Sequence, residues 1–233
     1  VDLGTMNMRA TLAVGDEPTD VVFACGAGRA FVCVSQEDAV KIYDPVQLAL
    51  APAVVPLFGN DPRALAVSPD GATVYAAIFE SGNRTSIISA PEVGAGGGSP
   101  LPNPLLAPGL PLPPPVGLIL FYDGTHWVDE VGTKNWDTVV SIPYTLPDDD
   151  VARLDANAGL PVPGYYAGVG TLNYNLTVNP VTGRLYVPNV ESFNLVRFEP
   201  NVQGKFARNR VTLIDPGPGT VVPVHLNPHI NYA

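Results

Sequence analysis

The sequence repeats itself, and the repeat limits the folds that the chain can adopt. The first copy begins at residues 15–18 and reads GDEPTDVVFACGAGRAFVCVSQEDAVKIYDP. The second begins at residues 59–62 and reads GNDPRALAVSPDGATVYAAIFESGNRTSIISAP. Each copy holds an apolar run, a glycine turn, a second β-rich run, a polar turn and a third strand. Periods of about 40–50 residues with several short strands are typical of propeller blades.

A third copy lies further along the chain. The segment LTVNPVTGRLYVPNVES matches LAVSPDGATVYAAIFES of the second copy, with Pro180 and Gly183 in the places of Pro69 and Gly71. Pro-Asp-Gly supplies a fixed φ followed by residues that tolerate a positive φ, so it joins two strands tightly. We therefore expect the same strand–turn–strand unit in both copies.

The composition of the strands predicts their depth in a blade. Residues 64–67 and 74–78 are almost wholly apolar, as in strands that are covered on both faces by neighbouring blades. Residues 41–44 and 210–215 alternate more and are expected nearer to solvent. The sequence therefore favours an all-β fold, a β-propeller of four-stranded antiparallel blades. A β-sandwich of hairpins is the alternative.

Composition agrees with a folded β-rich chain and excludes some partners. The 233 residues include 23 Gly and 26 Pro, about twice the usual share, which disfavours long helices. The chain is 46% hydrophobic and carries a net charge of −10, so a phosphate backbone or an anionic membrane surface would repel it. No segment approaches the roughly 20 apolar residues that a membrane-spanning helix needs. We expect neither a nucleic-acid partner nor a membrane span.

The repeats resemble those of the YVTN-type β-propeller family. The resemblance rests on GDEPTDVVF, NDPRALAVSPDGATVYAA and LTVNPVTGRLYVPN, and the order of the later segments is similar to that in large secreted bacterial propeller proteins. It implies an extracellular, cell-surface or periplasmic location. It also implies that further blades, and in some proteins a c-type haem domain, follow. This chain has no CxxCH and cannot itself attach such a haem.

Three copies are too few to close a ring, because propellers use about four to eight blades. Residues 1–233 are thus expected to form an incomplete propeller of about three to four blades. We expect the ring to be closed by C-terminal blades outside these residues or by another chain. Residues 8–14, MRATLAV, are expected to be a strand with no blade of this chain to receive it.

Two segments interrupt the repeats. Residues 94–115 are rich in Gly and Pro and are expected to form an extended surface loop, with a polyproline ligand segment as the alternative. Residues 116–160 are expected to form an irregular hairpin insertion, with a turn at Asp123-Gly124 and one or two later strands. Those strands are expected either to complete the second blade or to build an irregular extra blade.

The acidic run Asp148, Asp149 and Asp150 is the candidate metal site. Carboxylate oxygens are the ligands that calcium prefers, and three adjacent carboxylates repel one another unless a cation is present. The run does not match an EF-hand loop, and a solvated turn is the alternative reading. Calcium is the one cofactor that the sequence suggests.

Cysteine and histidine carry less information. Cys25 and Cys33 are expected on or beside the strands of one hairpin, with an offset that disfavours a disulfide without excluding it. His225 and His229 flank a proline, so a helical metal pair is disfavoured. His126 lies in the expected hairpin, and no Ser-His-Asp pattern is readable.

These observations favour a binding or assembly scaffold on a secreted or cell-surface propeller. The alternative is part of a redox or hydrolytic enzyme, with a cofactor in the propeller channel or in a c-type haem domain outside this chain. A coat or filament subunit that closes its edge on a neighbour is a third reading. Propellers host all of these functions, so the fold does not decide between them.

Overall fold

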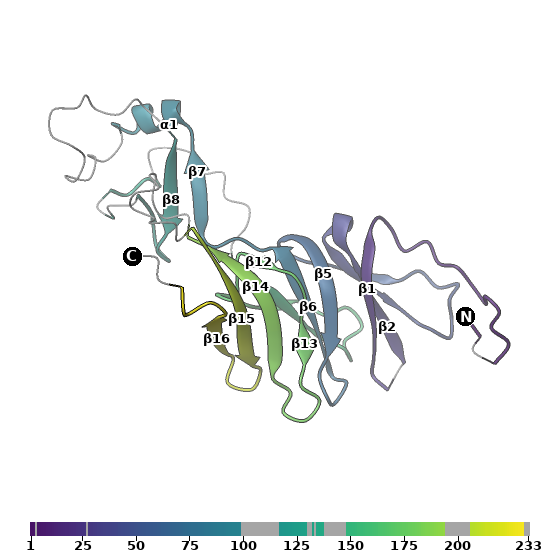
Figure 1. Cartoon of the computed structure of the whole chain (residues 1–233). Coiled ribbons are helices and arrows are strands. Elements are labelled where there is room, and N and C mark those ends of the chain that lie inside the picture. The colour runs from purple at the N-terminus through teal and green to yellow at the C-terminus, as the bar shows by residue number, and fades with distance from the viewer. Residues whose placement is uncertain are drawn as a thin grey trace. The chain divides into compact units, whose positions relative to one another are not determined.

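The computed structural model describes residues 1–2, 4–26, 28–98, 117–129, 132, 134–137, 148–193 and 206–230. The chain divides into two compact units. Unit one comprises Val1–Asn83, Leu146–Glu191 and Arg208–Pro228, and unit two comprises Arg84–Thr145, Ser192–Ala207 and His229–Ala233. The described residues are nearly all β (Figure 1), as the repeats predicted.

Unit one consists of three blades of four antiparallel strands (Figure 1). Blade one is β1 (Pro18–Ala24), β2 (Arg29–Val34), β3 (Ala39–Tyr43) and β4 (Ala53–Pro56), with a 3-10 turn at Ser35–Glu37. Blade two is β5 (Asn60–Val67), β6 (Thr73–Glu80), β10 (Val151–Asp155) and β11 (Gly164–Tyr166). Blade three is β13 (Thr177–Val178), β14 (Leu185–Ser192), β15 (Ala207–Asp215) and β16 (Thr220–His225). The short β12 (Leu172–Asn173) pairs with both β6 and β14 and so joins blades two and three.

The blades are arranged side by side through their first strands. Strand β5 contacts both β1 and β13. Across the first junction the Leu65 amide donates to Asp20 Oδ2 at 2.8 Å, and the Cys25 amide donates to the Gly71 carbonyl at 3.2 Å. Successive blades that meet at their inner strands form a propeller arc, so the sandwich alternative is wrong.

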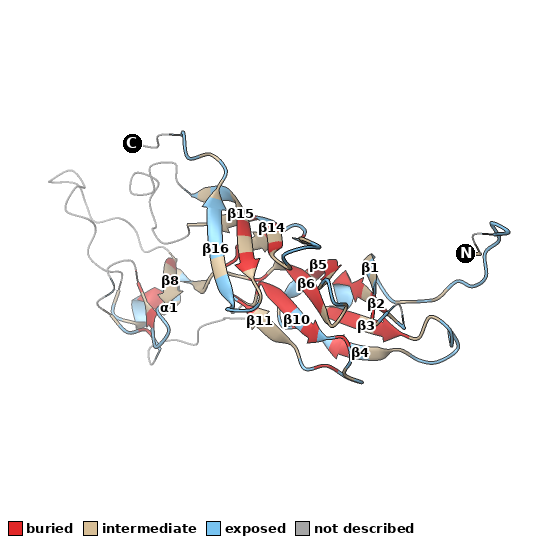
Figure 2. Ribbon diagram, turned by 90° about the horizontal axis from the view of Figure 1, so that it is seen from below, coloured by how far each residue is buried: buried red, intermediate tan, exposed pale blue. Residues whose placement is uncertain are grey.

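Two apolar cores fill the junctions between the blades. Leu65 and Val67 of β5 pack toward blade one, whereas Ala64 and Ala66 of the same strand pack toward blade three. Side chains alternate between the faces of a strand, so a strand with a blade on each side must be apolar on both faces. Figure 2 shows β6 and β10 coloured as mostly buried for this reason. The prediction that residues 64–67 and 74–78 form inner strands is confirmed.

The two proline turns also form as predicted. In the turn of blade two, Gly71 has a φ of +72° and its amide donates to the Ser68 carbonyl at 2.8 Å. In blade three, Gly183 has a φ of +73° and its amide donates to the Asn179 carbonyl at 2.9 Å. Glycine adopts a positive φ at less cost than residues with a β-carbon, which explains its recurrence.

Unit two contains a three-stranded sheet with a small core of its own. Its strands are β7 (Thr85–Ile88), β8 (Leu118–Tyr122) and β9 (Trp127–Val128), and a short helix α1 (Ala90–Ala95) follows β7. The hairpin at Asp123-Gly124 is confirmed, because β8 pairs with β9 across it. Two tryptophans, Trp127 and Trp136, anchor this core.

The structure corrects one boundary and one strand, and it settles one open alternative. Gly94 and Ala95 belong to helix α1 instead of a loop, and the rest of the 94–115 prediction from residue 99 onward lies outside the described residues. Strand β10, inside the expected 116–160 insertion, completes blade two. Residues 8–14 form no strand, because no described edge pairs with them and an isolated strand has no hydrogen-bonding partner.

Candidate functional site

The first open surface is the face of blade one that points away from blade two. In β1, Val22 and Ala24 pack into the junction core, whereas Val21 and Phe23 are 52% and 55% exposed. In β4, Val55 is buried in that core and its neighbour Val54 is exposed. Blade one therefore has a covered apolar face and a partly open face, which is apolar except for Lys41, paired there with Glu37.

The second open surface is the face of blade three that points away from blade two. Figure 2 colours most of β16 as exposed. In this strand Val221 packs toward the junction core, whereas Val222 and Val224 are 47% and 44% exposed. They pair with Leu213 and Val211 of β15 and share their face. Apolar side chains that are adjacent on one sheet face are characteristic of an interaction surface.

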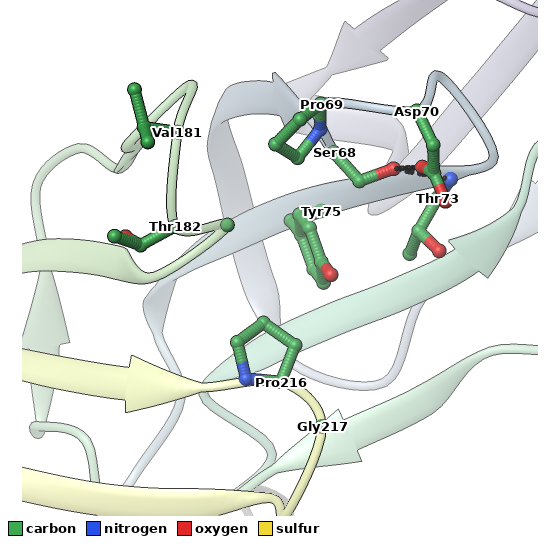
Figure 3. Close-up of a pocket in the computed structure, with 10 residues that line it drawn as sticks. Ser68, Pro69, Asp70, Thr73, Tyr75, Val181, Thr182, Pro216 and Gly217 are labelled. Carbon is green, nitrogen blue, oxygen red and sulfur yellow. Dashed lines mark hydrogen bonds between the residues drawn. The ribbon is translucent and has the colours of Figure 1, made fainter.

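A shallow pocket of about 350 Å³ lies where the turns of blades two and three meet (Figure 3). It is lined by Tyr75, Thr182 and Pro216, among others. The nearby Asp70 carboxylate accepts hydrogen bonds from the Ser68 hydroxyl and the Ala72 amide, and these lower its pKa. The Oδ1 atom of Asp70 therefore holds its own turn together.

The acidic run lies at the opposite end of blade two, where β10 begins. Asp150 is fully buried, and its carboxylate accepts hydrogen bonds from the Ser81 hydroxyl and from the amides of Val169 and Gly170. Asp148 is also buried and accepts a hydrogen bond from the Gly168 amide at 3.3 Å. Two of the three carboxylates thus hold the loop that leads from β11 to β12.

Burial governs the protonation of this run. Desolvation raises the pKa of Asp150 well above its usual range, and the charge of Asp148 raises it further. Burial and Asp148 also raise the pKa of Asp149. Within the described residues, no three His, Cys, Asp or Glu side chains come together in a cluster that could hold a metal ion. Calcium binding at Asp148, Asp149 and Asp150 stays a prediction.

A half-buried ion pair extends this polar region into blade three. Arg210 donates to Glu191 at 2.8 Å, to Asn189 Oδ1 at 3.1 Å and to the Val169 carbonyl at 2.6 Å. Burial raises the pKa of Glu191, and the charge of Arg210 opposes this shift. The β11–β12 loop is therefore held from blade two by Asp150 and from blade three by Arg210.

Ser81, Glu191 and Arg210 were not predicted from the sequence. They come from three distant segments, so no local spacing brings them together. One signal existed, because the Glu-Ser pair at residues 80–81 recurs at residues 191–192 in the matched position of the third copy.

Both cysteines are free thiols, so the disulfide that the sequence left open does not form. Cys25 follows β1 and is half-buried, with its thiol 2.9 Å from the Ala156 carbonyl. Cys33 is fully buried in β2, and burial raises the pKa of its thiol to about 12.

Thiol labelling checks this difference. At pH 8 a pKa near 12 leaves about one Cys33 thiol in 10⁴ ionised, and the thiolate is the reactive form. We expect iodoacetamide to modify Cys25 at least about 100-fold faster than Cys33 in the folded protein. In urea, where Cys33 is solvated, the two rates should converge. Equal rates in the folded protein would contradict the burial of Cys33.

The structure places the three histidines in separate elements. His225 ends β16 in unit one, whereas His229 belongs to unit two. His126 lies in the hairpin of unit two, with its Nδ1 atom 2.6 Å from Asp137 Oδ2.

No protein-family model matches the sequence, and no curated protein sequence matches it. Among solved structures the chain is similar to hydrazine synthase of Kuenenia stuttgartiensis, with 15% identity, a TM-score of 0.38, and coverage of 97% of this chain and 59% of that one. It is similar to a putative 6-phosphogluconolactonase from Bacteroides uniformis, with 11% identity, a TM-score of 0.41, and coverage of 89% and 40%. It is also similar to the periplasmic gluconolactonase PpgL of Pseudomonas aeruginosa, with 16% identity, a TM-score of 0.35, and coverage of 90% and 40%. The chain spans less than two thirds of each of these structures.

Proposed function

We propose that this chain is one arc of a β-propeller ring that acts as a binding and assembly scaffold outside the cytoplasm. In the complete ring, further propeller blades pack against the open faces of blades one and three. These blades belong either to the same polypeptide or to a partner chain. The resemblance to secreted YVTN-type propellers supports the location.

One observation carries the proposal. The apolar alternation that builds both internal junctions continues onto the outer faces, where Phe23 and Val222 have no blade to cover them within the described residues. Exposed apolar sheet faces favour association, so a covering layer of the same chemistry is the simplest complement. No helix among the described residues has the length and hydropathy to cross a membrane.

A charge on an open face tests the proposal. The native protein here means the complete ring, with the blades that close it. In it, Phe23→Lys would place an ammonium group in a blade junction, and burying an unpaired charge costs several kcal/mol. We expect the melting temperature of the native protein to fall by about 10 °C or more. In residues 1–233 alone, the same substitution should change it little, because Phe23 is exposed there.

Val181→Lys is the matched control, because Val181 is 89% exposed on the turn between β13 and β14. If Phe23→Lys and Val181→Lys behave alike in the native protein, no blade covers blade one and the proposal is wrong. If Phe23→Lys is the more destabilising of the two, the intact mass of the native assembly distinguishes closure by the same polypeptide from closure by a second chain.

A further inference from the structure

Two of the inner strands, β1 and β5, carry an irregular residue at equivalent positions near their starts. The pairing of β1 with β2 shifts between Pro18 and Asp20, and the pairing of β5 with β6 shifts between Pro62 and Ala64. Each shift is a β-bulge whose extra residue is Thr19 in blade one and Arg63 in blade two. Bulges re-aim a side chain out of the regular alternation of a strand, and they are over-represented beside functional sites.

The repeat places Tyr174 at the same position of blade three. Matching LTVNP to LAVSP aligns Leu176 with Leu65, so Tyr174 takes the place of Arg63. The three positions are also linked in space. The Thr19 hydroxyl donates to the Pro62 carbonyl at 3.3 Å, and the Phe79 ring connects Arg63 to Tyr174. We call Thr19, Arg63, Phe79 and Tyr174 the inner-rim cluster.

Aromatic contacts fix the geometry of this cluster. The Arg63 guanidinium lies over the Phe79 ring, 3.9 Å from its centroid. The Phe79 and Tyr174 ring centroids are 5.6 Å apart. Stacking on an aromatic face holds the guanidinium plane but uses none of its N–H donors. The Tyr174 side chain is 50% exposed, so part of its ring is open to a ligand.

The guanidinium of Arg63 has unused hydrogen-bonding capacity. The Asp61 carboxylate lies 3.9 Å from its Nη2 atom, which is beyond hydrogen-bond distance. Its Nε atom is buried and has no hydrogen-bond partner among the described residues. A guanidinium carries five donors, and a buried donor without an acceptor is costly. The side chain is 40% exposed, so a ligand can reach the guanidinium from its exposed side, although not at the buried Nε atom.

We propose that the inner-rim cluster binds a small aromatic carboxylate. The two carboxylate oxygens would accept paired hydrogen bonds from Arg63, and the ligand ring would stack on Tyr174. The acids around the site favour a monoanion over phosphate. Gln36 donates to both Glu17 and Asp61, so two carboxylates lie near Arg63 and would repel a dianion more strongly.

Benzoate is the probe, titrated into the full chain by isothermal calorimetry. We expect saturable binding at millimolar concentrations, weakened at least about 10-fold by Arg63→Lys, which keeps the charge but loses the paired geometry. Tyr174→Leu should weaken binding about 5-fold through the loss of stacking. Arg184→Lys is the matched control, because Arg184 is similarly exposed (41%) but pairs with Asp215 through both Nε and Nη2. That variant should bind as the original protein does.

A second readout needs no variant. Nuclear magnetic resonance of the arginine Nε–H groups should show that benzoate shifts the Arg63 signal and leaves the Arg184 signal in place. An unmoved Arg63 signal, unaltered affinity in Arg63→Lys, or tighter binding of inorganic phosphate than of benzoate would overturn the proposal. These outcomes are independent of ring closure, since every residue of the cluster lies in the three described blades.

Discussion

Replacing Asp150 by alanine is expected to lower the free energy of unfolding of unit one by about 3 kcal/mol or more. The Asp150 carboxylate is the common acceptor for Ser81, Val169 and Gly170. Each buried donor left without an acceptor costs about 1–3 kcal/mol. Urea unfolding measures this loss, and a loss below about 1 kcal/mol would show that the carboxylate does not hold the β11–β12 loop.

The conservative variant Asp150→Asn separates charge from shape. Because burial raises the pKa of Asp150 in the folded state, the folded protein binds more protons than the unfolded chain above pH 4. The contribution of Asp150 to stability therefore falls as pH rises from the unfolded pKa through the folded one. We expect the stability of the original protein relative to Asp150→Asn to decrease over this window. A difference that is constant with pH would contradict the raised pKa.

Replacing Phe31 by alanine should be equally severe, for a different reason. Phe31 is fully buried in the core between blades one and two. Large-to-small changes at such aromatic positions cost about 3–5 kcal/mol through lost contacts and the cavity left behind. We expect Phe31→Ala to uncouple blade one from blade two in residues 1–233 alone.

Phe23→Ala is the control for this prediction. Phe23 and Phe31 lie on neighbouring strands of one blade but on opposite faces, and Phe23 is 55% exposed. In residues 1–233 alone, Phe23→Ala should cost less than about 1 kcal/mol, since only part of its surface is buried. Urea unfolding of both variants measures the difference. Equal losses would mean that the two faces of blade one are not as distinct as the structure indicates.

The blade strands could be predicted because their signal is local. The apolar run from Ala64 to Val67 and the proline turns each lie within a short segment of the sequence. These features select strands and tight turns whatever lies elsewhere in the chain. The assignment of β10 to blade two was left open, because strand pairing across a long insertion depends on contacts that no local pattern records.

The polar residues were harder to predict for the same reason. Asp150 stood out as one of three adjacent acids, but its partners Ser81 and Gly170 come from other segments. The bulge at Arg63 is recognisable only from the strand pairing, because nothing in the sequence around Pro62 and Arg63 marks an extra residue. The expected strand at residues 8–14 has a suitable pattern, yet a pattern without a partner edge forms no sheet.

Ring closure is tested most directly by hydroxyl-radical footprinting at Phe23 and Val222. Both side chains are exposed in residues 1–233 and should be modified when that segment is studied alone. In the native protein the same two positions should be protected, because neighbouring blades would cover them. If Phe23 and Val222 are modified as readily in the native protein as in the isolated segment, the chain is not an arc of a closed propeller.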